Sequence, residues 1–178
     1  MAREVFIHNS RIIKKCLSFT DVIGDENYAV SYLDEYMRFT TQESESCFTM
    51  LFDNDSIGRG IQIVETDKNS FHLAVNLPCT EEDVKMLYKL SRRIAYLWKS
   101  NHIIVEDTRV ELPEIEKVEE QDIAMNKSLL ADAPKVFGDD FATLYCAWLP
   151  ICIPISQLQA YSEDYQGFSK YLDDRQGI

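Results

Sequence analysis

The sequence has few of the residues that interrupt a fold. Only 6 glycines and 5 prolines occur in 178 residues, too few for a linker-rich or disordered chain. Basic residues are also scarce: 18 lysines and arginines stand against 30 aspartates and glutamates, and the net charge is −12. This balance argues against nucleic-acid binding, because neutralising phosphates requires a basic surface. It also argues against attraction to an anionic membrane, so we expect no membrane partner.

Long apolar segments are missing as well. The N-terminus, MAREVFIHNS, lacks the apolar core of a signal peptide. The apolar run FATLYCAWLPICIPI contains Pro150 and Pro154 and is shorter than the roughly 20 residues of a membrane span, so we expect it in a buried core. The 5 cysteines are scattered and odd in number, which favours reduced thiols. We therefore expect a cytoplasmic protein.

Motifs for metals and nucleotides are absent. The 3 histidines lie far apart, and neither C-x-x-C nor H-E-x-x-H occurs. Gly58-Arg59-Gly60 lacks the third glycine and the lysine of a phosphate-binding loop, and it precedes a predicted strand, where no helix N-terminus points at a phosphate. A turn is the better interpretation, and we expect no metal and no cofactor.

One arrangement leaves an enzymatic alternative open. His72 and Asn76 share a face of a predicted strand, and Cys79 follows just before a predicted helix, where a thiolate is stabilised. Glu81, Glu82 and Asp83 crowd the same helix start and oppose an anion there. A buried, inert thiol is therefore favoured, and an unrecognised active site near residues 71–83 is the alternative.

The clearest local pattern runs from Phe71 to Asp107. FHLAVNL alternates like a strand and ends at Pro78. Thr80 is a strong N-cap residue, and Asp83 stands at the partner position of a capping box. Apolar residues at helical spacing follow up to Trp98, and HIIVE then predicts a short strand.

The remaining elements are predicted from periodicity and turn residues. Strands are expected at 4–8, 11–17, 47–52, 60–65 and 141–149, the first two forming a hairpin, with a helix as the alternative for 11–17. Helices are expected at 25–39, over part of 115–131, after Pro154 and at 163–175. Residues 107–116 are interpreted as an irregular connector.

These elements predict an α+β protein, with an antiparallel β-sheet of four to six strands and helices packed mainly on one face. A chain of this length suits a single domain over residues 1–178. The polar segment 40–46 offers an alternative division. A hairpin-plus-helix unit would then cover residues 1–46, and the main unit would cover residues 47–178.

Two segments resemble a domain-of-unknown-function family of Gram-positive bacteria. SIGRGI at 56–61 is similar to its S-x-G-[KR]-G strand start, and NLPCTEED at 76–83 is similar to its LNLPTTxxDI junction. Ile153-Pro154-Ile155-Ser156, with the last helix, resembles its NPIS segment. The resemblance implies no activity, cofactor or catalytic residue. The family's members are longer, so it implies a shortened form here.

One charge pattern stands out on the predicted helix after Asp83. Its polar residues gather on one arc and include no acid. We call this arc the basic stripe: Lys85, Lys89, Arg92, Arg93, Tyr96 and Lys99. We expect the basic stripe to pair with the protein's own acids, such as those in Glu111–Asp122. The alternative is that it forms a docking face for an acidic partner. We expect a non-catalytic protein that acts through a protein partner or as a homo-oligomer.

Overall fold

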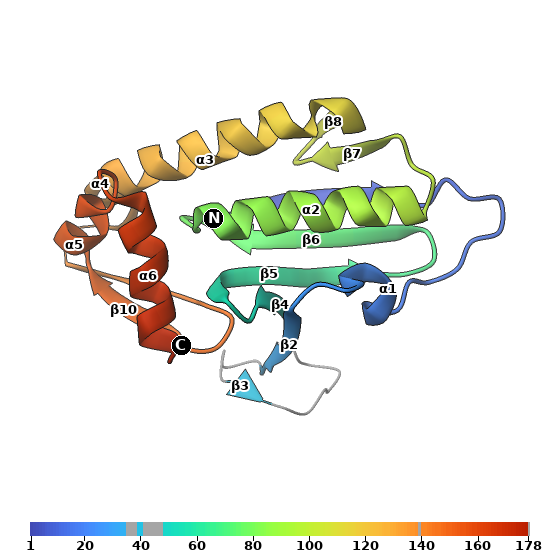
Figure 1. Cartoon of the computed structure of the whole chain (residues 1–178). Coiled ribbons are helices and arrows are strands. Elements are labelled where there is room, and N and C mark those ends of the chain that lie inside the picture. The colour runs from blue at the N-terminus through green and yellow to red at the C-terminus, as the bar shows by residue number, and fades with distance from the viewer. Residues whose placement is uncertain (35–38, 41–47, 139, 178) are drawn as a thin grey trace.

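A computed structural model describes residues 1–34, 39–40, 48–138 and 140–177 (Figure 1). The fold is α+β, with an antiparallel sheet and helices packed over it, as predicted. The strands are β1 Ala2–His8, β2 Tyr28–Leu33, β3 Phe39–Thr40, β4 Phe48–Asp53, β5 Ser56–Thr66, β6 Ser70–Asn76, β7 His102–Val105, β8 Thr108–Glu111, β9 Phe141–Leu144 and β10 Ile151–Pro154. The α-helices are α1 Phe19–Ile23, α2 Glu81–Leu97, α3 Ile115–Ala131, α4 Ala133–Phe137, α5 Ile155–Ala160 and α6 Tyr165–Gln176, and a 3₁₀ turn η1 covers Leu112–Glu114.

The described strands of the main sheet have the order β3-β2-β4-β5-β6-β1-β7-β8, and neighbours are antiparallel. Among the described residues the sheet therefore has eight strands, more than the four to six expected. The N-terminal strand β1 lies inside it, between β6 and β7. The single domain and its alternative division near residue 46 stay predictions.

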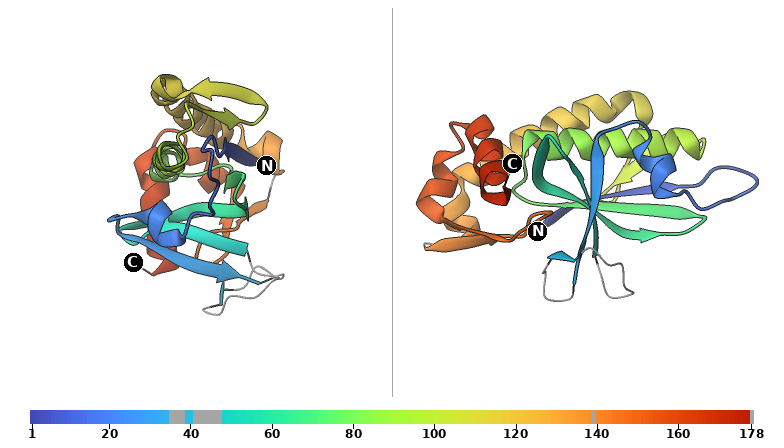
Figure 2. Two further views of the ribbon diagram at one scale, coloured as in Figure 1. Left: turned by 90° about the vertical axis from the view of Figure 1, so that its right-hand side faces the viewer. Right: turned by 60° about the horizontal axis from the view of Figure 1, so that its bottom comes forward.

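The long helix α2 packs on the sheet, and α3 lies beside it in the same layer (Figure 2). The apolar face of α2 buries Leu87, Ile94 and Ala95 against the strands. This burial explains why α2 is apolar at every third or fourth position. Thr80 caps it as predicted: its hydroxyl accepts from Asp83 N, and Asp83 reaches back to the Thr80 N–H. No helix among the described residues is long and apolar enough to cross a membrane.

A second apolar cluster lies beyond the N-terminal end of α2. It joins α5 and α6 to the two-stranded sheet of β9 and β10. Phe168 and Leu172 of α6 are fully buried there, beside Ile153 and Leu158. The apolar run that was expected in a core therefore contributes two strands and a loop, and its alternate residues are buried.

The predicted helix over residues 25–39 is wrong where the structure describes it. Residues 28–33 form β2, which pairs with β4 from Tyr28↔Asp53 to Leu33↔Phe48. The apolar and aromatic residues of YAVSYL fit the two-residue period of a strand as well as the 3.6-residue period of a helix. Pairing with the neighbouring strand therefore decides the conformation of this segment. Residues 35–38, and 41–46 of the predicted polar boundary, lie outside the described residues.

The predicted N-terminal hairpin and the irregular connector are also wrong. Residues 11–17 form no strand, because both edges of β1 are already paired, with β6 and with β7. Within the expected connector, Thr108–Glu111 forms β8 as a hairpin with β7. The turn between them uses Glu106 at φ +52°, a conformation that sequence patterns rarely indicate for glutamate.

The buried carboxylate of Asp83 links α2 to the start of β5. It accepts hydrogen bonds from the backbone N–H groups of Arg59 at 3.0 Å and Gly60 at 2.9 Å, in addition to those from Thr80. Burial raises the pKa of this carboxyl group, and the hydrogen bonds from Arg59 and Thr80 oppose that rise. The S-x-G-R-G segment and the NLPCTEED junction are therefore two halves of one contact.

The glycines and the arginine of this segment are required by the same contact. Gly58 and Gly60 have φ values of +55° and +72°, and a Cβ at Gly58 would lie 2.6 Å from the Oδ1 atom of Asp83. The side chain of Arg59 is buried and donates to the carbonyl oxygens of Pro78 and Tyr145 at 2.7 and 2.8 Å. Gly58-Arg59-Gly60 therefore lies in a structural junction within β5, so the predicted turn is wrong here, although the glycines do have positive φ values.

We expect Asp83→Ala to destabilise the protein strongly. The change leaves the N–H groups of Arg59, Gly60 and Thr80 without their acceptor, and each buried unsatisfied donor costs about 1–3 kcal/mol. We therefore expect a loss of about 3 kcal/mol or more in the free energy of unfolding, measured by urea denaturation. Asp21→Ala removes the matching capping-box aspartate from the exposed start of α1 and should cost less. Equal losses would contradict the role given to the β5 contact.

Candidate functional site

The residues of the enzymatic alternative do not converge on a cavity. The ring of His72 stacks on Phe6 at 3.9 Å between centroids, and its Nε2 atom lies 3.3 Å from Glu4. Cys79 is fully buried in the core under α2, and burial raises the pKa of its thiol well above the usual value. Its backbone is held by Asn126 and Tyr165. A protonated thiol enclosed in this way is not a nucleophile.

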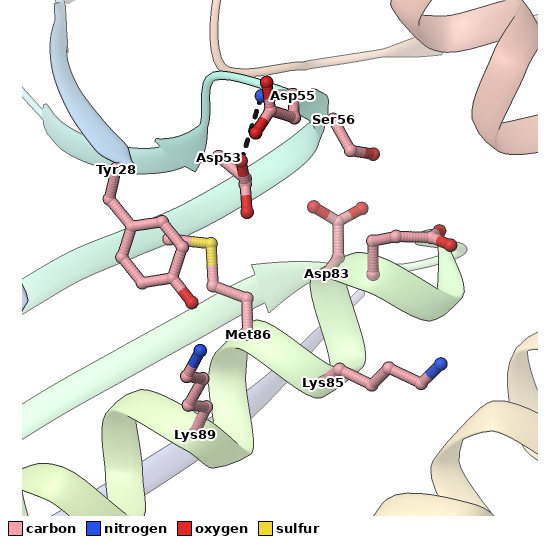
Figure 3. Close-up of a pocket in the computed structure, with 9 residues that line it drawn as sticks. Tyr28, Asp53, Asp55, Ser56, Asp83, Lys85, Met86 and Lys89 are labelled. Atoms are coloured by element: carbon pink, nitrogen blue, oxygen red, sulfur yellow. Dashed lines mark hydrogen bonds between the residues drawn. The ribbon is translucent and has the colours of Figure 1, made fainter. Parts of the chain in front are cut away.

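A hollow of about 240 Å³ lies between the β4–β5 turn and the first turns of α2 (Figure 3). Asp53, Asp55 and Glu82 line it together with Lys85 and Lys89. The cations are already engaged, Lys85 with Glu81 and Lys89 with Glu26, at 2.6 Å each. The charges of this hollow are therefore partly neutralised by the protein itself.

A second hollow, of about 390 Å³, lies between α3 and the β7–β8 hairpin. Arg3 and Asp122 line it and form an ion pair, and Tyr88 donates a hydrogen bond to the same carboxylate. Tyr88 is buried, and burial raises the pKa of its phenol. This cluster ties β1 and α2 to α3, and Asp122 accepts from both Arg3 and Tyr88, whereas the Nε atom of Arg3 has no acceptor among the described residues. Among the described residues, no group of histidine, cysteine, aspartate and glutamate side chains could hold a metal ion.

The N-terminal part of the basic stripe is paired with the protein itself. Lys85 and Lys89 form the ion pairs named above, and these bonds raise the pKa of both lysines. The Nη2 atom of Arg92 lies 4.0 Å from Glu119, and the Nε atom of Arg93 donates to the carbonyl oxygen of Asp21 at 2.7 Å. Of these partners, only Glu119 falls in the expected segment Glu111–Asp122.

The C-terminal part of the stripe is different. Tyr96 is 80 % exposed, and Lys99 lies beside the loop that connects β1 to α1. This loop extends past the end of α2 in two views (Figures 1 and 2). At its centre, Ile12 and Ile13 are 102 % and 75 % exposed, so two adjacent branched apolar side chains face solvent.

Two hydrogen bonds hold the start of the loop against the rest of the protein. Ser10 N–H donates to the carbonyl oxygen of Trp98 at 3.1 Å, and the side chain of Asn9 donates to the carbonyl oxygen of Lys68 at 2.8 Å. These bonds join the loop to the C-terminal end of α2 and to the β5–β6 turn. We call the resulting surface the basic end: Arg11, Ile12, Ile13, Lys14, Lys15, Lys68, Tyr96 and Lys99.

The cations of the basic end have no acidic partner. Within the described part of the chain, no carboxylate lies within 4.0 Å of the charged nitrogens of Arg11, Lys14, Lys15, Lys68 or Lys99. Lys14 makes one hydrogen bond, to the side chain of Asn69 at 3.3 Å. A protein with a net charge of −12 thus carries a cluster of unpaired positive charge around two exposed isoleucines.

The stripe pointed to only part of this surface. It predicted Tyr96 and Lys99, and it missed the loop because RIIKKCL was interpreted as a strand. The charge pattern of the loop is visible in the sequence, with Arg11 before the isoleucines and Lys14 and Lys15 after them. Two adjacent apolar residues between cations occur in buried strands as well as in exposed loops. The exposure of Ile12 and Ile13 could therefore not be predicted.

The fold and this surface define an α+β protein with unpaired cations and two exposed isoleucines at the C-terminal end of α2. The chain belongs to a family described as domain of unknown function (DUF4299), whose model matches residues 2–178. No curated protein and no solved structure matches the chain significantly.

Thiol accessibility tests the environment of Cys79. We expect iodoacetamide to label Cys16 and Cys152, which are exposed, and to leave Cys79 and Cys146 unlabelled in the native protein. Burial raises the pKa of Cys146 to about 12 and also raises that of Cys79, so neither forms the reactive thiolate. Peptide mapping by mass spectrometry measures each site, with urea-unfolded protein as the control. Rapid labelling of native Cys79 would revive the enzymatic alternative.

The paired part of the stripe should stabilise the fold modestly. Replacing Lys89, Arg92 and Arg93 with Gln removes contacts with Glu26, Glu119 and Asp21. Exposed pairs contribute about 0.2–1 kcal/mol each, so we expect a total loss of about 1 kcal/mol in urea denaturation. Lys99→Gln should leave the unfolding curve unchanged, because Lys99 has no such partner. A larger loss from Lys99→Gln would contradict this division of the stripe.

Proposed function

We propose that the protein is a non-catalytic interaction protein that docks on an acidic protein partner through its basic end. The observation that supports this proposal is the cluster of unpaired cations around Ile12 and Ile13. Exposed cations that lack acids of their own are free to pair with a partner's carboxylates. The rest of the stripe serves the fold, since its N-terminal members contact acids or a backbone carbonyl of the same chain.

The two kinds of residue in the basic end have separate roles. Burying an isoleucine fully contributes about 1.5–3 kcal/mol, so Ile12 and Ile13 supply affinity. The surrounding cations supply orientation and selection, because complementary charge speeds encounter and disfavours basic partners. The net charge of −12 strengthens the selection, since acidic partners that approach any other face are repelled.

We propose that this docking takes place in the cytoplasm. The described cysteines, Cys16, Cys79, Cys146 and Cys152, are all free, and free thiols suit a reducing compartment. A separate partner is preferred to a second copy of the chain. The basic end of one copy would have to dock on an acidic face of the next, and such a heterologous contact closes only if its rotation forms a ring.

Site-specific cross-linking tests the docking surface. A benzoylphenylalanine in place of Ile13 should yield a discrete cross-linked product in the cells that make the protein. The same group at Phe141, an exposed residue of β9, serves as the matched control and should not yield that product. Replacing Arg11, Lys15 and Lys99 with Gln in the Ile13 variant should remove at least nine-tenths of the product. Immunoblotting measures the yield, and mass spectrometry identifies the partner.

Three outcomes would contradict the proposal. An Ile13 variant without any product would mean that the basic end has no partner. A product that persists after the cations are removed would mean that charge does not select the partner. A product of twice the monomer mass would make a second copy of the chain the partner.

A further inference from the structure

Two hollows flank the exposed loop of the basic end, one on each side of Arg11. The first has a volume of about 270 Å³ and is lined by Arg11 and Lys15 together with Asp21 and Trp98. The second has a volume of about 440 Å³ and is lined by Arg11, Ile12, Ile13 and Lys99. Arg11 lines both hollows, so one segment bound across this side chain could place a side chain in each.

The first hollow suits an anion. Arg11 and Lys15 bring two positive charges without an ion pair, and the guanidinium of Arg93 is bound close by, at the carbonyl oxygen of Asp21. Asp21 opposes them with one negative charge. Its carboxylate already accepts from the N–H and hydroxyl groups of Ser18 at 2.9 and 2.7 Å, and those bonds lower its pKa. The net charge of the wall is therefore positive.

Trp98 also lines this wall and is only 1 % exposed. Its indole N–H is enclosed and has no acceptor among the described residues. The cations Arg11 and Lys15 therefore supply the binding groups of the first hollow, and the Trp98 ring reports on changes in its wall.

The second hollow suits an apolar side chain. Ile12 and Ile13 supply branched hydrocarbon, and the methylene stem of Lys99 can cover the ligand while its charge stays in water. The exposure of two adjacent isoleucines on a loop anchored by backbone hydrogen bonds is explained if a partner covers them.

We propose that the two hollows bind adjacent side chains of an acidic protein segment. A carboxylate enters between Arg11 and Lys15, and a neighbouring leucine-like side chain packs on Ile12 and Ile13. This inference rests on the function proposed above and names the chemistry of the partner. A protein segment is favoured over an anionic bilayer, because single side chains of a segment can enter the hollow beside Trp98 and a flat bilayer surface cannot.

Fluorescence anisotropy with synthetic peptides tests the proposal. The probe is a labelled peptide that alternates leucine with pairs of glutamates. The comparison peptide has serine in place of leucine and the same charge. We expect the leucine peptide to bind at least 10-fold more tightly than the serine peptide. Both should lose at least 10-fold in affinity with Arg11→Gln/Lys15→Gln, and only the leucine peptide should lose affinity with Ile12→Ser/Ile13→Ser.

Matched variants control for nonspecific effects. Lys117→Gln/Lys127→Gln removes two exposed cations of α3, and Val136→Ser/Phe141→Ser removes two exposed apolar side chains. Neither pair should change the affinity for either peptide by more than twofold. Binding can also be placed in the first hollow by NMR. In a Trp148→Phe background, the remaining indole N–H signal belongs to Trp98 and should shift when the leucine peptide is added.

The outcomes separate this inference from the proposed function. Equal binding of the two peptides would overturn the apolar subsite, and an unchanged Trp98 signal would overturn the carboxylate subsite. If neither peptide binds while the Ile13 cross-link persists, the inference fails and the proposed function stands. If phosphatidylglycerol vesicles bind the wild-type protein and the peptides do not, a bilayer is the occupant and the protein-segment proposal is overturned.

Discussion

Donors from two distant parts of the chain converge on the buried carboxylate of Asp83. Thr80 belongs to the start of α2, whereas Arg59 and Gly60 belong to the start of β5. The carboxylate therefore caps the helix and fixes its position on the sheet with the same atoms. The C-terminal helix depends on this junction, because Asp173 and Gln176 bind the backbone of Gly58 at 3.0 and 2.7 Å. The junction therefore holds both α2 and α6 at the start of β5.

The sequence predicted the fold class and the elements whose signals are local. The capping box of Thr80 and Asp83 locates the start of α2 to the residue, whereas the helix ends at Leu97, before the predicted stop near Ser100-Asn101. Signals that depend on distant partners failed. YAVSYL became β2 because β4 offers an antiparallel edge, and RIIKKCL stayed a loop because the edges of β1 were taken. The resemblance carried by SIGRGI and NLPCTEED predicted a domain-of-unknown-function family, which the family model confirms, although the contact that joins them could not be seen in either segment alone.

The candidate surface was only partly predictable, because the partners of its charged residues are also distant in the sequence. A stripe of cations on a helix carries no mark that separates paired charges from unpaired ones. The difference arises from what the fold places opposite each residue: Glu26 and Glu119 face Lys89 and Arg92, whereas an isoleucine-bearing loop faces Lys99. The same physics explains both ends of α2. Charges are compensated where the chain folds back on the helix, and they stay uncompensated where the helix ends at solvent.

The central position of β1 constrains the order in which the protein is assembled. On the ribosome this strand emerges before its partners, which are Ser70–Asn76 on one edge and Ile104–Val105 on the other. Most of the sheet must therefore be synthesised before β1 can be enclosed, and the loss of loop entropy delays its pairing further. Until then Val5 and Ile7, which become fully buried, are open to chaperones and to other nascent chains. A group fused ahead of Ala2 would act on this late step of folding, at a distance from the basic end.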